Sequence, residues 1–122
     1  MNKTKVLRIG IASREQMKAR TIAVARGTHK RAANEPKVWF TSMESLAQVL
    51  STKNTLLLEL IRRARPASLK ELADLSGRAV SNLSRTLRTM ERYRLVTLKE
   101  SDSGTLVPTV PYDRLMLERE LG

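Results

Sequence analysis

The sequence predicts a mainly α-helical protein with a small amount of β structure, an α+β fold. From about residue 42 to residue 92 the apolar residues recur with helical spacing. On either side of that region, the runs 5–13 and 95–110 contain short alternating stretches typical of strands. The chain has 122 residues, which is enough for one small domain with an appended element.

The charge of the chain is strongly positive and unevenly distributed. A net charge of +11, from 23 basic and 12 acidic residues, favours an anionic partner, most often nucleic acid, less often an acidic protein or membrane surface. Residues 1–37 hold ten basic residues and two glutamates, and a second cluster runs from Arg78 to Arg94. We therefore divide the chain into a basic extension and linker, 1–37, expected to mediate dimerisation, and a domain, 38–122.

The N-terminal extension reads as a strand followed by a helix. The segment "KVLRIGIAS" (5–13) alternates in the manner of a strand, and Ser13 is a suitable cap for a helix that Gly27 ends. The polar, basic segment 28–37 contains Pro36 and is typical of a linker. A short extended "KVWF" follows.

Helical spacing dominates the next fifty residues. The expected helices are 43–50 after the cap Ser42, 52–65, 69–76, and about 78–92. Pro66 ends the second of these, Ser68 and Glu71 form a capping box for the third, and Gly77 supplies the turn before the fourth. On the second helix one apolar side is expected, made of Leu56, Leu57, Leu60 and Ile61.

The fourth helix, about 78–92, has two contrasting faces. Its inner stripe is expected to hold Val80, Leu83, Leu87 and Met90. Its other side carries hydrogen-bond donors and no acid, namely Arg78, Ser81, Asn82, Arg85 and Arg88. A solvated face usually mixes both signs of charge, so this one is a candidate contact surface.

From residue 95 on, the apolar residues recur with a period of two. The segments "LVTL" and "TLVPTV" flank a polar turn with Gly104, which predicts a hairpin. The tail 112–121 fits both a strand and a helix, and we favour the strand.

Three helices followed by a hairpin is the order of a winged helix-turn-helix domain, which commonly binds double-stranded DNA. In that arrangement the helix at 78–92 reads the major groove. Its candidates for base edges and phosphates are Arg78, Ser81, Asn82 and Arg85. Those expected to contact phosphates are Arg88, Arg92 and Arg94, with Lys99 at the base of the wing. Protein-interaction modules built on the same fold are the alternative.

The segment from "FTSMESLAQVL" through "GRAVSNLSRTLRTMERYRLV" resembles the MarR-like winged-helix regulators. More closely, the chain is similar to small prokaryotic DNA-binding proteins encoded beside a toxin-like partner, in which a strand and helix precede such a segment and a "VPYD" strand closes the chain. The recognition turn departs from that group, since "GRAVSNLSRT" replaces its "GRDxxxVxRD". The preference of that group for particular DNA sequences is therefore not carried over to this chain.

This resemblance implies a transcriptional regulator, an autorepressor, or alternatively an antitoxin that binds and neutralises a cognate toxin through its N- or C-terminal part. A strand at 5–13 would have a free edge unless it pairs, so we expect a homodimer formed through residues 1–25. Paired reading helices would match a palindromic operator.

No pattern in the sequence favours an enzyme, a cofactor or a metal site. The single histidine, His29, has only Glu35 as a nearby acid, and neither a Gly-rich phosphate loop nor a serine with a suitably spaced histidine is present. Cysteine is absent, which fits a reducing cytoplasm, and the longest apolar run is too short to span a bilayer. The aromatic pair Trp39 and Phe40 is expected in a core or an interface.

Overall fold

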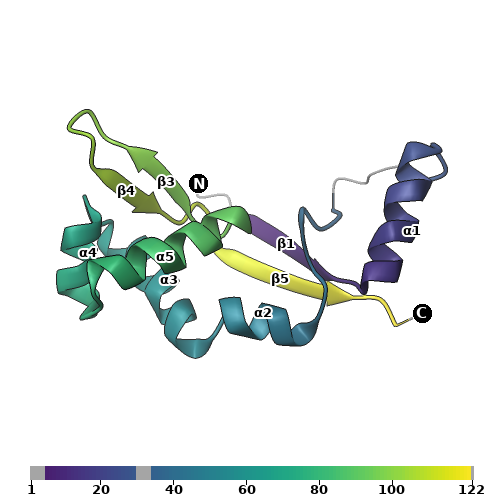
Figure 1. Ribbon diagram of the computed structural model, residues 1–122, viewed down its shortest axis with the longest axis horizontal. Helices are drawn as coiled ribbons and strands as arrows, with labels where there is room; N and C mark the ends of the chain where they lie inside the picture. Colours follow the sequence, from purple (N-terminus) through teal and green to yellow (C-terminus); the bar gives the residue numbers. More distant parts are fainter. Residues whose placement is uncertain (1–4, 30–33, 122) are drawn as a thin grey trace. The chain divides into compact units, whose positions relative to one another are not determined.

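The computed structural model describes residues 5–29 and 34–121, and its elements are shown in Figure 1. The chain forms two compact units. The first comprises the chain up to Gln48 together with the chain from Asp113 on, and the second is Val49–Tyr112. These units differ from the expected division at residue 37 into a basic extension and a domain. The C-terminal tail returns to the first unit because its strand pairs with the N-terminal strand.

A three-stranded sheet forms the centre of the first unit. Its strands are β1 (Val6–Ile11), β2 (Val38–Phe40) and β5 (Arg114–Arg119), in the order β2-β1-β5. Both pairings are parallel, with Ile9 opposite Val38 and opposite Leu117. The prediction of a strand in the tail 112–121 is confirmed, and Figure 1 shows β1 and β5 side by side.

One face of this sheet supplies the core of the first unit. Residues paired across parallel strands share a face. The buried members of this face are Leu7, Ile9 and Ile11 of β1 with Val38 and Phe40 of β2. The short helix α2 (Met43–Val49) adds the buried side chain of Leu46, and its start is capped by the Ser42 hydroxyl, which accepts from the Ser45 amide at 3.0 Å.

The position of β1 removes one reason for expecting a dimer through the N-terminal strand. This strand is paired on both sides within the first unit, so it has no free edge to offer a second copy. Long-range pairing with residues more than a hundred positions away fills the second edge, and sequence periodicity carries no information about such a partner. A homodimer through residues 1–25 stays a prediction, without the support of a free strand.

The helix α1 (Arg14–Ala25) begins at a complete capping box between Ser13 and Gln16 and ends before Gly27, whose φ is 74°. None of its residues is buried, and Ile22 is 41% exposed. The helix contacts the rest of its unit through the Arg20 guanidinium, which lies 4.9 Å from the centre of the Trp39 ring.

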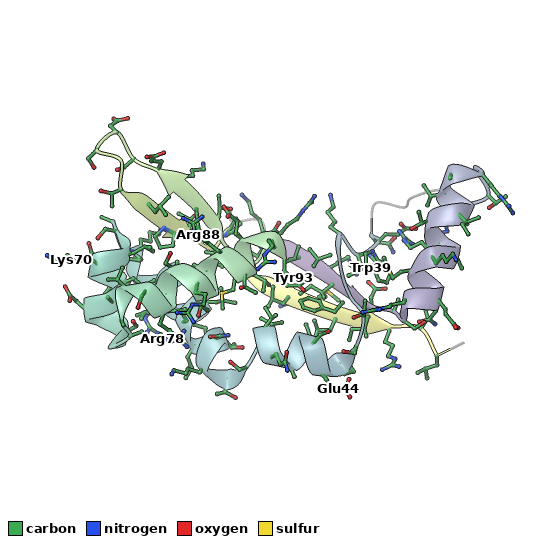
Figure 2. The ribbon with its side chains drawn as sticks, in the orientation of Figure 1. Trp39, Glu44, Lys70, Arg78, Arg88 and Tyr93 are labelled. Atoms are coloured by element: carbon green, nitrogen blue, oxygen red, sulfur yellow. The ribbon has the colours of Figure 1, made fainter. Side chains whose placement is uncertain are left out.

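A small polar cluster surrounds the same guanidinium. Arg20 donates to the Glu35 carboxylate at 2.5 Å, and the His29 Nε2 lies 2.8 Å from the other oxygen of Glu35. Below the cluster, Trp39 covers Gly10, where an added Cβ would overlap three ring carbons. Trp39 therefore lies against the sheet, as Figure 2 shows, and joins the cluster to β1.

Three helices form the body of the second unit: α3 (Thr52–Ala64), α4 (Leu69–Ser76) and α5 (Val80–Arg92). Serine hydroxyls cap the first two, since Ser51 accepts from the Asn54 amide and Ser68 accepts from the Glu71 amide. Gly77 ends α4 with a φ of 74°, as expected.

On α3 the buried side chains are Leu57, Leu58 and Ile61. The expectation that Leu56 is buried is wrong, because it is 58% exposed. The real stripe is rotated by about one position from the expected one. Three consecutive leucines at 56–58 leave the rotation of such a helix undetermined until its neighbours are known.

An antiparallel hairpin completes the second unit. It consists of β3 (Thr97–Glu100) and β4 (Leu106–Thr109), joined by a turn in which Gly104 has a φ of 82°. Leu95, Val96 and Pro108 are buried in this unit. The predicted hairpin and the coarse α+β fold are confirmed. None of the helices in residues 5–29 and 34–121 has the length and apolar character needed to cross a membrane.

Candidate functional site

The candidate site is the outer face of α5, and the buried side of that helix sets its orientation. Leu83, Leu87 and Met90 are each 0% exposed and recur at intervals of four and three residues. Burial of such a stripe leaves a helix only one rotation about its axis. The residues on the opposite side are therefore held outward in a fixed order.

The outward stripe of α5 repeats the same spacing on the opposite side. Its residues are Ser81, Arg85, Arg88 and Arg92, all exposed, and Asn82 is exposed beside them. No acidic residue occurs between Arg78 and Met90. Hydroxyl, amide and guanidinium groups on one helical face can donate to phosphate oxygens and to base edges.

The start of α5 differs from the expectation in two ways. The helix begins at Val80 rather than at Arg78, because Ala79 is its N-cap in an extended conformation. Val80 itself is 45% exposed, so its expected place in the buried stripe is wrong. Val80 is the first residue of α5, three positions before Leu83. At this end of the helix its side chain is not covered by the core.

Arg78 lies in the turn before α5 and is anchored to α3. Its Nη2 donates to the Asn54 Oδ1 at 3.0 Å. Asn54 is itself fixed, since its amide nitrogen donates to the Ser51 hydroxyl at 3.2 Å and its Nδ2 donates to the Val49 carbonyl at 3.1 Å. Figure 2 labels Arg78 at this turn and Arg88 on the helix.

Sequence reasoning missed Asn54. As the third residue of a capped helix it reads as an ordinary capping neighbour, and nothing in its spacing links it to a residue 24 positions away. The contact places one end of the Arg78 guanidinium on α3. One guanidinium nitrogen of Arg78 is therefore used in a structural contact, and the side chain is half-buried. Arg85 and Arg88 are exposed.

The remaining candidates continue from the end of α5 into the hairpin. Arg92 is the last residue of the helix, and Arg94 is exposed with a left-handed φ of 61°. Lys99 is exposed in β3, next to Glu100. The turn of the hairpin is closed by two backbone bonds, from Ser101 to the Thr105 carbonyl at 2.8 Å and from Gly104 to the Ser101 carbonyl at 2.9 Å.

The site therefore belongs to a small α+β protein with a basic, acid-free helical face in its second unit. Residues 49–117 match the HVO_A0114 family, and because the match covers more than half of the chain, the chain belongs to this family. The matched segment includes the whole second unit and the first residues of β5. No curated protein and no solved structure matches the chain.

Proposed function

We propose that the chain is a sequence-specific double-stranded DNA-binding transcriptional regulator, an autorepressor, with the second unit acting as a MarR-like winged helix-turn-helix module. The observation that carries the proposal is the outward face of α5, whose rotation is fixed by three fully buried residues. The order of α3, α4, α5 and the hairpin supports it, since this is the order of elements in such a module.

In this mechanism α4 and the turn at Gly77 hold α5 so that its first half enters the major groove. We assign Arg85 to guanine O6 and N7, and Asn82 to adenine N6 and N7. Ser81 contacts either kind of edge. Val80, exposed in the first turn, offers an apolar contact for a thymine methyl group.

The remaining basic residues are assigned to the phosphate backbone. Arg78, held by Asn54, lies at the beginning of the reading helix, while Arg88, Arg92 and Arg94 lie along and beyond it. Lys99 is assigned to the hairpin wing. Glu100 and Asp102 near the hairpin turn are exposed and repel phosphate, so the tip of the wing contributes little to affinity.

The experiment titrates the full chain against a duplex carrying the promoter of its own gene, followed by fluorescence anisotropy. Arg85→Ala is expected to weaken binding by about 10- to 100-fold, as loss of a bidentate base contact does. The matched control is Arg63→Ala, which removes the same charge from the last turn of α3, at the far end from Asn54. That control should retain most of the affinity.

Two results would contradict the proposal: an affinity of Arg85→Ala equal to that of the unmodified chain, or equal losses in both variants. Equal losses would mean that charge alone, and not the α5 face, determines binding. The unmodified chain should also lose affinity steeply as salt is added, because phosphate contacts release counterions.

A second function is proposed from the first unit, an antitoxin-like role in which the chain covers an acidic cognate toxin. The supporting observation is α1, which buries none of its side chains and exposes Arg14, Lys18 and Arg26 in or beside it. Co-expression with the product of the adjacent gene, followed by size-exclusion chromatography, tests it. Separate elution of the two proteins would contradict this role.

A further inference from the structure

The strand β5 leaves one edge of the first unit's sheet unpaired. It is the outer strand in the order β2-β1-β5, and its described neighbour is β1 alone. The opposite outer strand, β2, has three residues, whereas β5 has six. An unpaired strand of this length presents a row of amide and carbonyl groups that can pair with another strand.

The direction of the peptide groups in β5 follows from its contacts with β1. The Arg114 amide donates to the Lys5 carbonyl at 3.3 Å, so Arg114 turns its peptide groups toward β1. Alternate residues of a strand turn these groups to opposite edges. Those of Leu115 and Leu117 therefore face the free edge.

The side chains of β5 are more apolar than an unpartnered edge usually is. Leu117 is 50% exposed and Met116 is 40% exposed. Edge strands that must stay single usually carry proline, a bulge or inward charges. β5 has the sequence "RLMLER", with an apolar centre between charges of opposite sign and no proline.

We propose that this edge is occupied by β5 of a second copy of the chain, antiparallel and related by a two-fold axis beside Met116. In this register Leu115 of each copy lies opposite Leu117 of the other, and their outward peptide groups bond to one another. Arg114 lies opposite Glu118 of the other copy. The two Met116 side chains meet at the axis, and the sheet continues from one copy into the next.

Charge and shape select this register over its neighbours. In a two-fold pairing, a contact of one residue in the first copy with another residue in the second copy is repeated with the copies exchanged. Every favourable or unfavourable pair away from the axis therefore occurs twice. A shift that centres the axis on Leu117 would place Leu115 opposite Arg119 and Met116 opposite Glu118. Apolar residues would then face charges, whereas the register at Met116 pairs leucine with leucine and arginine with glutamate.

The contact already made by Glu118 is compatible with this pairing. Its Oε1 lies 3.7 Å from the Arg8 Nη1, and the two side chains are 50% and 34% exposed. Arg8, Arg114 and Glu118 share one face of the sheet, because Arg8 is paired with Met116 in the β1–β5 register. The inference concerns the first unit alone, so it does not depend on the proposed DNA-binding function.

Cysteine cross-linking tests the axis directly, because the chain contains no cysteine of its own. Met116→Cys places two thiols opposite each other across the axis, at a spacing that permits a disulfide. Arg8→Cys in β1 is the matched control on the same face of the sheet, because Arg8 is paired with Met116 and lies outside the proposed contact. Its two thiols would be separated by three strand spacings, about 14 Å, too far for a disulfide.

After mild oxidation of the full chain, Met116→Cys should run almost entirely as a covalent dimer in a non-reducing gel, and Arg8→Cys as a monomer. Equal cross-linking of both variants would indicate random collision and overturn the proposal. Cross-linking of Leu117→Cys in preference to Met116→Cys would overturn the register.

Exchange of the charges at Arg114 and Glu118 tests the same interface without a covalent cross-link. The unmodified chain should have the mass of a dimer in sedimentation equilibrium. Arg114→Glu should shift it to a monomer by facing two glutamates, and adding Glu118→Arg should restore the dimer. A monomeric unmodified chain, which would leave the edge to a different partner, overturns the proposal, as does a dimer unaffected by Arg114→Glu.

Discussion

The helices α1 and α5 are nearly equal in length, with 12 and 13 residues, and carry two and three arginines, yet they are held by different means. α5 buries three side chains completely, whereas α1 buries none. α1 is held by its cap and by the contacts of Arg20 with Glu35 and Trp39. A helix can thus equal another in length and still lack a fixed outer face, because only a buried stripe fixes the rotation.

The two units show the same contrast in their cores. In the second unit the core comes from helices and a hairpin that are neighbours in the chain. In the first unit it depends on β1, whose partners β2 and β5 come from distant segments. Trp39 is the single tryptophan of the chain and lies in the first unit, so its fluorescence reports on that unit separately.

The largest expected effect distinguishes the two helices by their buried side chains. Leu87→Ala should lower the free energy of unfolding by about 2–5 kcal/mol, since it empties a fully buried site in α5. Ile22→Ala in α1 should change it by about 0.5 kcal/mol or less, because that side chain is half exposed. Urea unfolding followed by circular dichroism measures both. Similar losses in the two variants would mean that α1 is packed as firmly as α5.

A smaller effect is expected at the contact that connects Trp39 to the sheet. Gly10→Ala should destabilise the first unit by about 1–3 kcal/mol, because the added methyl group overlaps the Trp39 ring and displaces it. Urea unfolding read by tryptophan fluorescence measures this loss.

The double variant Gly10→Ala with Trp39→Leu supplies the control, read by circular dichroism because it lacks the tryptophan. Once the ring is gone, the methyl group should cost little beyond the loss from Trp39→Leu alone, since contacting residues are not additive. Strictly additive losses would show that Gly10 is required for another reason.

The smallest effect is expected at the end of α3, where Arg65 has a left-handed φ of 48°. Glycine adopts this conformation without the penalty of about 1 kcal/mol that a side chain imposes, so Arg65→Gly should raise the melting temperature slightly. Arg63→Gly, two residues earlier and inside the helix, should lower it. Thermal unfolding of the pair checks the sign, and a decrease in both variants would rule out relief of strain at Arg65.

Local signals predicted much of the second unit and the outer face of its last helix. The stop at Pro66, the cap at Ser68 and the turn at Gly77 each act over a few residues, which is why the ends of α3 and α4 were predictable. The positions of Leu56 and Val80 were not, since several rotations of an apolar helix satisfy the same pattern. Asn54 was missed because its role depends on Arg78, a residue of another element.

The kinds of element, their order, and the separation of apolar from basic residues on α5 could all be predicted from the amino-acid sequence. These follow from period, capping and charge, which are properties of neighbouring residues. The folded chain was needed to show that the C-terminal strand lies beside the N-terminal one and that β1 is paired on both sides. The same holds for the edge of β5 that no described residue pairs with. Strand partners far apart in the chain are chosen by packing and register, and no local pattern records that choice.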